Sequence, residues 1–329
     1  MHEDSIADLL PHSRFGAITN VTELTKGLSG AVVHAVTTTV GEYVVRRVTA
    51  QDVATWQREL AIHRLASDAG IAPPLEWVDE AAPATVSRRI IAPSSGAFGE
   101  PEARPRVLAS VVEQLATLHA LPVDGIAGVS PLDVARGVWN QQSARPGFPA
   151  WAMPLAEHFT RCEQLFAVDS RRVLSHNDLN PANILWDGER AWLVDWEASG
   201  AAHPYYDLAT ISMFLSLSDD VALALLAAQE RAPISVDQAE TFRALRRLTN
   251  IFYGAVFISL VSEIESAMPA RAEDAPTIPQ LYAMLGSGAI NLRSPQGQIA
   301  FGSALLRTAV EERAASASSA TDGTRSENR

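Results

Sequence analysis

The sequence has a single cysteine, Cys162, among its 329 residues, so it can form neither an intrachain disulfide nor a cysteine-rich metal site. Positive charge is also scarce. Lys plus Arg is 26 and Asp plus Glu is 38, a net charge of −12, which argues against a nucleic-acid partner held by bulk positive charge. The only lysine is Lys26, so any chemistry that requires a lysine has one candidate.

Long hydrophobic runs are lacking as well. The most apolar stretch, Ile251–Val261, is well short of the ~20 residues that a helix needs to cross a bilayer, so we expect a buried helix and no membrane partner. The N-terminus opens with acidic residues and lacks the pattern of a secretory signal, which favours a cytoplasmic protein. With 47% hydrophobic and 19% charged residues, the chain has enough apolar material for a sizeable core.

The first part of the chain is rich in strand patterns. Residues 21–48 contain β-branched runs separated by Gly41, which predicts two antiparallel strands joined by a turn. Residues 51–70 carry apolar side chains at helical spacing and predict one helix. A further strand is expected over 84–92, and a turn-rich linker over 93–105.

After the linker the pattern becomes helical. Apolar residues recur at helical spacing over 107–121 and again from Asp220 to the end, with one compact exception over 173–200. The residues from Ala314 onward are small and polar, which predicts disorder. The expected parts are a β-rich lobe over 1–94, a mostly helical lobe over 95–313 and a disordered tail over 314–329.

The exceptional segment contains a predicted hairpin. Two short apolar runs, NILW and AWLVD, flank a turn signal at 187–190. If the turn is centred on Glu189, Asn183 lies directly opposite Asp195 at the open end. Directly opposed side chains project from the same face of a hairpin. An amide oxygen and a carboxylate placed together suit Mg²⁺, which takes few protein ligands and completes its shell with water and phosphates.

A second carboxylate precedes this pair. Asp178 lies five residues before Asn183, and Pro181 keeps the segment between them from continuing as a helix. A carboxylate beside a Mg²⁺ and triphosphate site can orient an alcohol and accept its proton. The spacing matches the catalytic loop of protein kinases with Asn177 in place of arginine, and residues 195–197 stand where those kinases have D-F-G.

The motifs together resemble one family of small-molecule kinases, the aminoglycoside phosphotransferase and choline kinase-like family. The resemblance rests on HNDLNPANIL, LVDWEASG, HPYYDLA at 203–209 and LATLHAL at 115–121. It implies an α+β, two-lobed protein-kinase-like fold with a β-rich, nucleotide-binding N-lobe and a mostly helical C-lobe that carries catalysis and substrate binding. The resemblance implies ATP and Mg²⁺ as cofactors. It implies a small hydroxylated molecule as the substrate.

The resemblance also assigns roles in the catalytic half of the site. Asp178 matches the catalytic aspartate, and Asn183 and Asp195 match the Mg²⁺ ligands. His176 is expected to hold the catalytic loop by hydrogen bonding, and Asp207 to support that loop from the helix that begins at DLA.

The nucleotide half of the site rests on weaker patterns. GLSGA, at 27–31, is similar to the phosphate-covering turn of aminoglycoside phosphotransferases, which makes Gly27, Ser29 and Gly30 candidate phosphate contacts. A plain hairpin turn is the alternative for these residues. Segment 88–92 is the expected adenine contact.

Kinases place a lysine on the third strand, where this sequence has arginine. Arg46 is the candidate for phosphate binding, because arginine keeps the charge and presents a fork to phosphate oxygens. Glu59 is its expected partner, since it lies at the margin of the apolar stripe of the 51–70 helix. The alternatives are a surface ion pair without function, or Arg47 as the functional residue.

The predicted function is transfer of the ATP γ-phosphoryl group to a hydroxyl of a small molecule. HND and DWE resemble the choline, ethanolamine and thiamine kinases, whereas GLSGA resembles the antibiotic-modifying enzymes, so an aminoglycoside remains an alternative to a cationic amino alcohol. Ala198 and Ser199 follow DWE where choline-type kinases have an aromatic residue. A protein kinase is disfavoured because Pro204 follows Glu197 too closely for an activation segment, and a non-catalytic nucleotide-binding regulatory protein is the alternative of another class.

Overall fold

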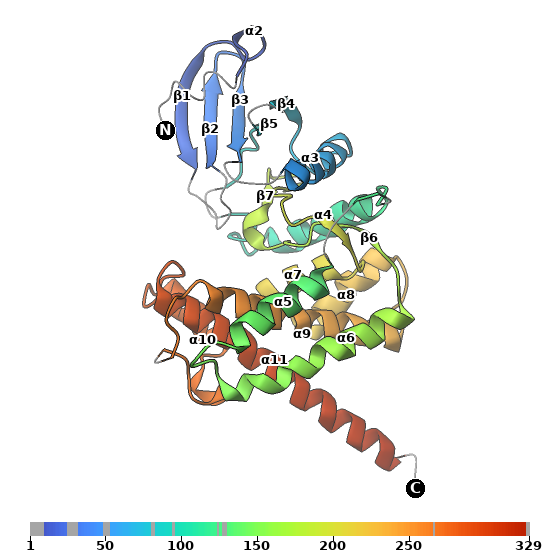
Figure 1. Cartoon of the computed structure of the whole chain (residues 1–329). Coiled ribbons are helices and arrows are strands. Elements are labelled where there is room, and N and C mark those ends of the chain that lie inside the picture. The colour runs from blue at the N-terminus through green and yellow to red at the C-terminus, as the bar shows by residue number, and fades with distance from the viewer. Residues whose placement is uncertain are drawn as a thin grey trace. The chain divides into compact units, whose positions relative to one another are not determined.

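The structure is a computed structural model that describes residues 10–24, 32–48, 53–79, 83–93, 96–123, 125–126, 130–265 and 267–326 (Figure 1), with side chains up to residue 313. The chain forms two compact units. The first comprises residues 1–128 and 173–201, and the second comprises 129–172 and 202–329. The predicted lobes, with a boundary at 94 and 95, divide the chain differently, because α4 (Arg104–His119) packs on β6 (Val173–Ser175) within the first unit. The predicted lobe boundary stays a prediction.

An antiparallel sheet forms the N-terminal part of the first unit. Its strands are ordered β1-β2-β3-β5-β4. They are β1 (Ile18–Leu24), β2 (Val32–Thr38), β3 (Glu42–Arg47), β4 (Leu75–Asp79) and β5 (Ala84–Arg88). The hairpin at Gly41 joins β2 and β3 as the sequence predicts, whereas β4, at the sheet edge, was missed because it has no buried residue and no alternation of buried and exposed positions.

The core of this sheet determines where Arg46 lies. Tyr43 and Val45 on β3 are buried in an apolar cluster, and the Tyr43 ring meets Phe15 edge-on at 4.9 Å between centroids. Because side chains alternate along a strand, Arg46 projects from the face opposite Val45. Arg46 pairs with Val33 on β2 and with Thr85 on β5, so its backbone is held on both sides.

Helix α3 (Val53–Asp68) follows the sheet, as predicted. Trp56 and Leu60 are buried, and so is Glu59, one position before Leu60. The helix ends at Asp68, and two residues later Gly70 has a φ of +70°, the left-handed conformation that favours glycine after a helix C-terminus.

The predicted hairpin is present, but its predicted register is wrong by one residue. β7 (Ile184–Trp186) and β8 (Ala191–Leu193) pair with Ile184 opposite Leu193, so Asn183 lies beside Val194 and not beside Asp195. The Val194 N–H donates to the Asn183 carbonyl over 3.0 Å. The turn has four residues, because the Asp187 carboxylate accepts hydrogen bonds from the backbone N–H groups of Glu189 and Arg190.

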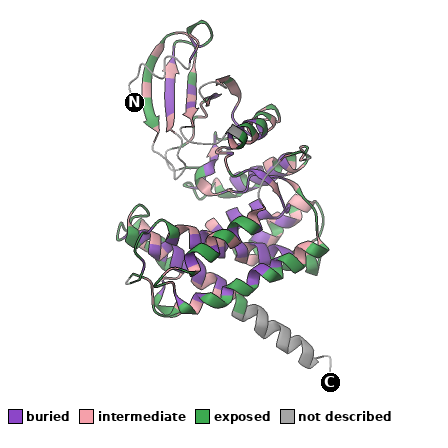
Figure 2. Cartoon of the chain, in the orientation of Figure 1, coloured by how far each residue is buried: buried purple, intermediate pink, exposed green. Residues whose placement is uncertain are grey.

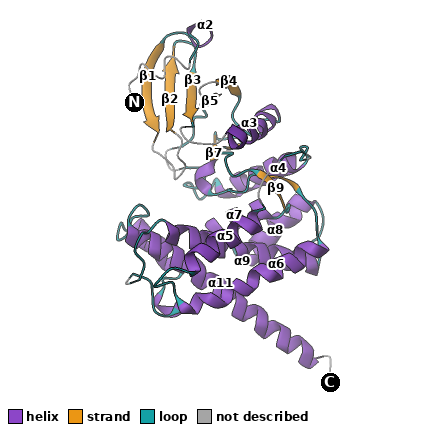
Figure 3. Ribbon diagram, in the orientation of Figure 1, coloured by secondary structure: helices purple, strands orange, loops and turns teal. Residues whose placement is uncertain are grey.

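Helices make up the second unit (Figure 3). They are α5 (Pro131–Ser143), α6 (Glu157–Val168), α7 (Tyr206–Phe214), α8 (Asp219–Glu230), α9 (Val236–Ser259), α10 (Ile278–Gly286) and α11 (Pro295–Ser326), with 3₁₀ turns η1 (Ala150–Ala156) and η3 (Ala272–Asp274). α9 packs against α5, α6, α7 and α11. Many of its residues are buried, as the purple segments in Figure 2 show. Gly254 and Gly302 let α9 and α11 approach closely, since a Cβ on Gly302 would lie 2.8 Å from the Gly254 carbonyl oxygen.

The expected buried helix over Ile251–Val261 lies largely within α9, with Ile251 and Ile258 fully buried. Among the helices that the structure describes, none has both the length and the apolar character needed to cross a membrane. The C-terminal segment differs from expectation, because α11 continues to Ser326 where disorder is predicted from Ala314. A helix already nucleated extends readily through alanine-rich sequence, which composition alone does not reveal.

Burial of His158 in α6 predicts a pH-dependent stability. The side chain is 7% exposed and its Nε2 donates to the Ala244 carbonyl over 2.8 Å. Burial lowers the pKa of His158 to about 4. Since the unfolded chain binds the proton more readily, stability falls as the pH drops below ~6.5 and levels off near the folded pKa.

The free energy of unfolding is therefore expected to be about 2 kcal/mol lower at pH 5 than at pH 7 from this one group. Urea denaturation at the two pH values measures the difference. His158→Gln keeps a donor near Ala244 but cannot titrate, so it should reduce the pH dependence by that amount. An unchanged pH dependence in this variant would contradict the assignment to His158.

Candidate functional site

Arg46 joins α3 to the segment that follows the hairpin. Its Nη1 donates a hydrogen bond to Glu59 Oε1, which is the contact that the sequence predicts. Its Nη2 lies 3.7 Å from Asp195 Oδ1 and 3.6 Å from Glu197 Oε2. The two nitrogens of the guanidinium fork therefore serve different partners. A lysine, with one nitrogen, cannot occupy both positions.

The electrostatics of this cluster are set by burial and by its three carboxylates. Burial raises the pKa of Glu59; Arg46 opposes this shift, and the nearby Glu197 and Asp195 charges add to it. The Glu59 side chain is 4% exposed and that of Arg46 is 16% exposed. The cluster contains one positive side chain, Arg46, and three carboxylates, so its excess negative charge favours a further cation nearby.

His176 holds the loop that precedes the hairpin against the segment that follows it. This residue is fully buried, and its Nε2 donates to the Val194 carbonyl over 2.9 Å. Its ring also packs against Trp196 at 4.8 Å between centroids. Asn177 has a φ of 65° and donates to the Ala198 carbonyl over 3.1 Å. These contacts tie the loop to residues 194–198, as the expected supporting role of His176 requires.

Asp178 and Asn183 are in direct contact. The Asn183 amide nitrogen donates to the Asp178 carbonyl over 2.8 Å and to its carboxylate Oδ2 over 3.1 Å. Asn180 donates to the same Oδ2 over 3.2 Å. Two amides thus hold one oxygen of the carboxylate, and Asp178 remains partly exposed. These hydrogen bonds fix the orientation of the carboxylate.

The donor set at Asn183 and Asp195 fits a hard divalent cation such as Mg²⁺. Both amide hydrogens of Asn183 face Asp178, which leaves the amide oxygen as its ligand atom. Asp195 Oδ1 is buried and has no hydrogen-bond donor among the described residues; Arg46 is near it only as an ion pair. Asp195 also has a φ of 67°, a conformation rare outside glycine and found often at functional sites.

In the first unit the structure forms two contact sets, Asp178 with Asn183 and Arg46 with Glu59 and Asp195. They are linked through Val194, whose N–H donates to the Asn183 carbonyl and whose carbonyl accepts from His176. A metal site shared by Asn183 and Asp195 stays a prediction. Asp207 is fully buried in the first turn of α7, in the second unit, and its supporting role stays a prediction. Gly27, Ser29 and Gly30 lie outside the described residues. Adenine contacts in segment 88–92 also stay a prediction.

Two residues of the site were missed from the sequence. Glu197 contacts Arg46, and Arg58 donates from α3 to the Glu197 carbonyl over 2.9 Å. Glu197 is the glutamate of the DWE motif, and its position two residues after Asp195 could have marked it as a site residue. No local pattern distinguishes Arg58 from any other arginine on a helix.

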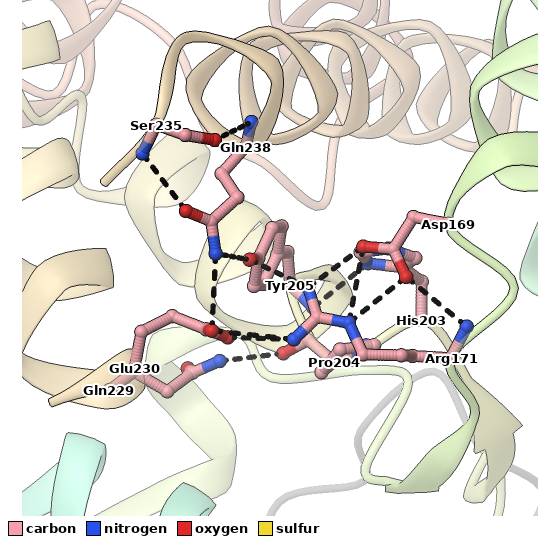
Figure 4. Close-up of polar contacts among 9 residues, drawn as sticks. All are labelled: Asp169, Arg171, His203, Pro204, Tyr205, Gln229, Glu230, Ser235 and Gln238. Atoms are coloured by element: carbon pink, nitrogen blue, oxygen red, sulfur yellow. Dashed lines mark hydrogen bonds and ion pairs between the residues drawn. The ribbon is translucent and has the colours of Figure 1, made fainter. Parts of the chain in front are cut away.

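The HPYYDLA motif begins in a polar cluster around Arg171 in the second unit (Figure 4). Arg171 Nη2 donates to Asp169 Oδ2 over 2.8 Å and to the Tyr205 hydroxyl over 2.7 Å, and Nη1 donates to Glu230 over 3.2 Å. The hydrogen bonds from Arg171 hold the pKa of Asp169 well below its usual range. His203 Nε2 lies 3.2 Å from the same carboxylate.

The Arg171 cluster also reaches the start of α9. Gln238 Nε2 donates to the Tyr205 hydroxyl over 3.0 Å, and Gln238 forms a capping box with Ser235 (Figure 4). Gln229 donates to the Pro204 carbonyl over 2.8 Å. The segment 203–205 is therefore held from α8 and α9 just before α7, the helix that carries Asp207.

The fold is that of a kinase-like phosphotransferase, with an antiparallel N-terminal sheet followed by a helical C-terminal region. The sequence matches the profile of the phosphotransferase enzyme family over residues 20–246, and the chain belongs to this family. The predicted fold class, the resemblance and the assignment as a phosphotransferase are confirmed.

Solved structures with the same fold include members of two groups of kinases. A choline/ethanolamine kinase family protein from Mesorhizobium loti is 18% identical, with a TM-score of 0.65 over 93% of this chain and 99% of that one. The choline kinase LicA from Streptococcus pneumoniae is 16% identical, with a TM-score of 0.64 over 95% and 97%. An aminoglycoside phosphotransferase from Streptomyces rimosus is 20% identical, with a TM-score of 0.50 over 76% and 99%.

Sequence similarity to a curated protein is confined to a short segment. Protein LicA of Haemophilus influenzae is 45% identical over 51 residues, which are 16% of this chain and 19% of that protein. The match therefore spans about a fifth of that relative's length.

The predicted role of Asn183 and Asp195 as metal ligands can be tested. Asp195→Ala removes a carboxylate whose buried oxygen accepts no hydrogen bond from the described residues, so nucleotide binding should lose its Mg²⁺ dependence. Calorimetric titration with ADP, with and without Mg²⁺, measures this. The expected result is a loss of ~10-fold or more in Mg²⁺-dependent affinity, with metal-free affinity little changed. Equal losses under both conditions would remove Asp195 from the metal site.

Proposed function

We propose that this protein transfers the γ-phosphoryl group of ATP, with Mg²⁺, to a hydroxyl group of a small cationic molecule. An amino alcohol such as choline or ethanolamine, or thiamine, is the proposed acceptor class. The observation that carries the proposal is the contact set of one unit: Asp178 bonded to Asn183, and Asp195 beside the Arg46–Glu59 pair. We further propose a cytoplasmic location.

Each residue has a distinct part in the proposed reaction. Asp178 orients the acceptor hydroxyl and accepts its proton, while the hydrogen bonds from Asn180 and Asn183 keep its carboxylate in place. Arg46 supplies positive charge to phosphate oxygens and is itself oriented by Glu59. Asn183 and Asp195 would hold Mg²⁺, which, when bound, neutralises charge on the transferred phosphoryl group.

Two observations bear on the acceptor. The structures of the Mesorhizobium loti protein and of the Streptococcus pneumoniae choline kinase cover 93% and 95% of this chain, against 76% for the Streptomyces rimosus enzyme, and HND and DWE agree with the first two. An aminoglycoside is the second candidate, since a structure of the Streptomyces rimosus enzyme contains ADP and streptomycin and GLSGA resembles that group. The alternative that is not an enzyme is a non-catalytic, nucleotide-binding regulatory protein.

The test is a coupled assay of ADP release with choline, ethanolamine, thiamine and streptomycin as acceptors, with Mg²⁺ present. We expect acceptor-dependent ADP release with one of the first three, and phosphorylated product by mass spectrometry. Asp178→Asn provides the inactive control. Activity with streptomycin alone would establish the second candidate. Nucleotide binding without turnover on any acceptor would favour the non-catalytic alternative.

A further inference from the structure

Arg190 connects the turn of the β7–β8 hairpin to the end of α3. Its Nη2 donates to the Gly70 carbonyl, which follows the C-terminus of that helix, and lies 3.4 Å from Gln114 Oε1 on α4. The guanidinium also stacks over the Trp192 ring, with its carbon 4.1 Å from the ring centroid. Arg190 thus contacts two helices and the hairpin at once, although it is far in sequence from both helices.

The same joint contains a backbone contact. The Leu193 N–H on β8 donates to the Ile71 carbonyl over 2.9 Å, one residue after Gly70. After α3, the Gly70 carbonyl therefore accepts a hydrogen bond from the Arg190 side chain, and the Ile71 carbonyl accepts one from the backbone of β8. At the opposite end of the segment, Arg58 on α3 donates to the Glu197 carbonyl. Residues 190–197 are therefore tied to α3 itself through Arg58 and to the two residues after its end through the Gly70 and Ile71 carbonyls.

This arrangement bears on the site because α3 carries Glu59 and segment 190–197 carries Asp195. The position of Arg46 depends on both, since Nη1 is held by Glu59 and Nη2 lies beside Asp195. A shift of α3 relative to the hairpin would separate these two partners. Charged groups must be held to within a fraction of an ångström to act on a developing charge.

We propose that Arg190 is a positioning residue that locks α3 to the hairpin and so presets Arg46 and Glu59 against Asp195. The proposal rests on the proposed nucleotide site, which it deepens. The planar fork of Arg190 matters because one side chain both donates to Gly70 and stacks on Trp192. The Asp187 carboxylate accepts from the Arg190 backbone N–H over 2.8 Å, which fixes the residue at the base of the turn.

The hairpin provides a matched control in Arg106. This arginine, on α4, donates to the Gly188 carbonyl over 2.9 Å in the same turn and lies over the Trp186 ring at 5.5 Å. No contact of Arg106 with α3 is present among the described residues. Arg106→Ala removes an arginine contact to the same hairpin turn without removing a contact of the joint.

The experiment compares Arg190→Ala, Arg190→Lys and Arg106→Ala by hydrogen exchange of α3 amides and by calorimetric titration with Mg²⁺ and ADP. Arg190→Ala should speed exchange in the C-terminal half of α3 by about tenfold or more. It should weaken nucleotide affinity by ~10- to 100-fold. Arg190→Lys should lie between it and the parent protein, and Arg106→Ala should change neither quantity in α3 or in the site.

The positioning role also predicts coupling. In a Glu59→Gln background the effect of Arg190→Ala on nucleotide affinity should be much smaller than in the parent protein, because the partner that Arg190 positions is already lost. Additive effects would show that Arg190 acts only on general stability. Unchanged exchange in α3 of Arg190→Ala, or an equal change in Arg106→Ala, would overturn the proposal.

Failure of the proposed function would give a different result. If the parent protein bound no nucleotide, the function would fail, while the exchange of α3 in the three variants would still decide whether Arg190 locks that helix. If exchange rose in Arg190→Ala but nucleotide affinity did not change, the link from α3 to Arg46 would be wrong.

Discussion

Replacing Asp178 with asparagine is expected to lower the turnover number by at least ~10²-fold, the lower range for a positioned acid–base group. Asparagine has nearly the same shape, but its amide cannot accept the proton that leaves the acceptor hydroxyl. The affinity for Mg²⁺ and nucleotide should be retained, since these contacts are assigned to Asn183, Asp195 and Arg46. Steady-state kinetics with a competent acceptor, together with calorimetric titration of ADP, separate the two effects.

The control for this variant is Asp237→Asn, the same substitution at an exposed residue in the first turn of α9. Its replacement removes a negative charge near a helix N-terminus, so it should lower the melting temperature slightly and leave turnover unchanged. Turnover of Asp178→Asn within threefold of the parent protein would exclude Asp178 as the proton acceptor.

The second large effect is expected at Arg46. Arg46→Ala should lower kcat/KM for ATP by about 10²-fold, the scale for losing one preorganised charge contact. Arg46→Lys should recover part of this loss, because lysine restores the charge but one nitrogen cannot serve both Glu59 and Asp195. The measurement is the dependence of rate on ATP concentration at saturating acceptor and Mg²⁺.

Arg47 is the matched control, as the next residue on the same strand. It projects from the opposite face of β3, so Arg47→Ala should be nearly neutral in ATP kinetics. A damaging Arg47→Ala with a harmless Arg46→Ala would reverse the assignment, and the functional meaning of the Arg46–Glu59 contact would be lost with it.

Arg46→Ala also has an expected effect on Glu59 that a stability measurement can detect. Without Arg46, the influence that opposes burial is removed, and the pKa of Glu59 rises further. The carboxyl group can then take up a proton instead of remaining a buried, unpaired charge. The loss of stability relative to the parent protein should therefore be smaller at pH 5 than at pH 8, as measured by urea denaturation.

Sequence and structure contribute differently to the catalytic half of the site. HNDLNPAN places Asp178 and Asn183 five residues apart with a proline between them, and local geometry is enough to bring their side chains into contact. The register of the hairpin was wrong because it depends on the turn, and the Asp187 hydrogen bonds make that turn four residues long. The left-handed conformation of Asp195 then removes it from strand alternation altogether.

By itself the sequence singled out the candidate residues Asp178, Asn183 and Asp195, because the motifs are short and their spacing is local. It also predicted the Arg46–Glu59 contact, with Arg47 as the alternative, since strand and helix periodicity each bear on which way a side chain projects. Only the tertiary structure decided what those residues meet across long separations: Glu197 beside Arg46, Arg58 on the Glu197 carbonyl, and Arg190 on Gly70. Such contacts depend on how helices and hairpins pack, and packing leaves no periodic signal in the chain.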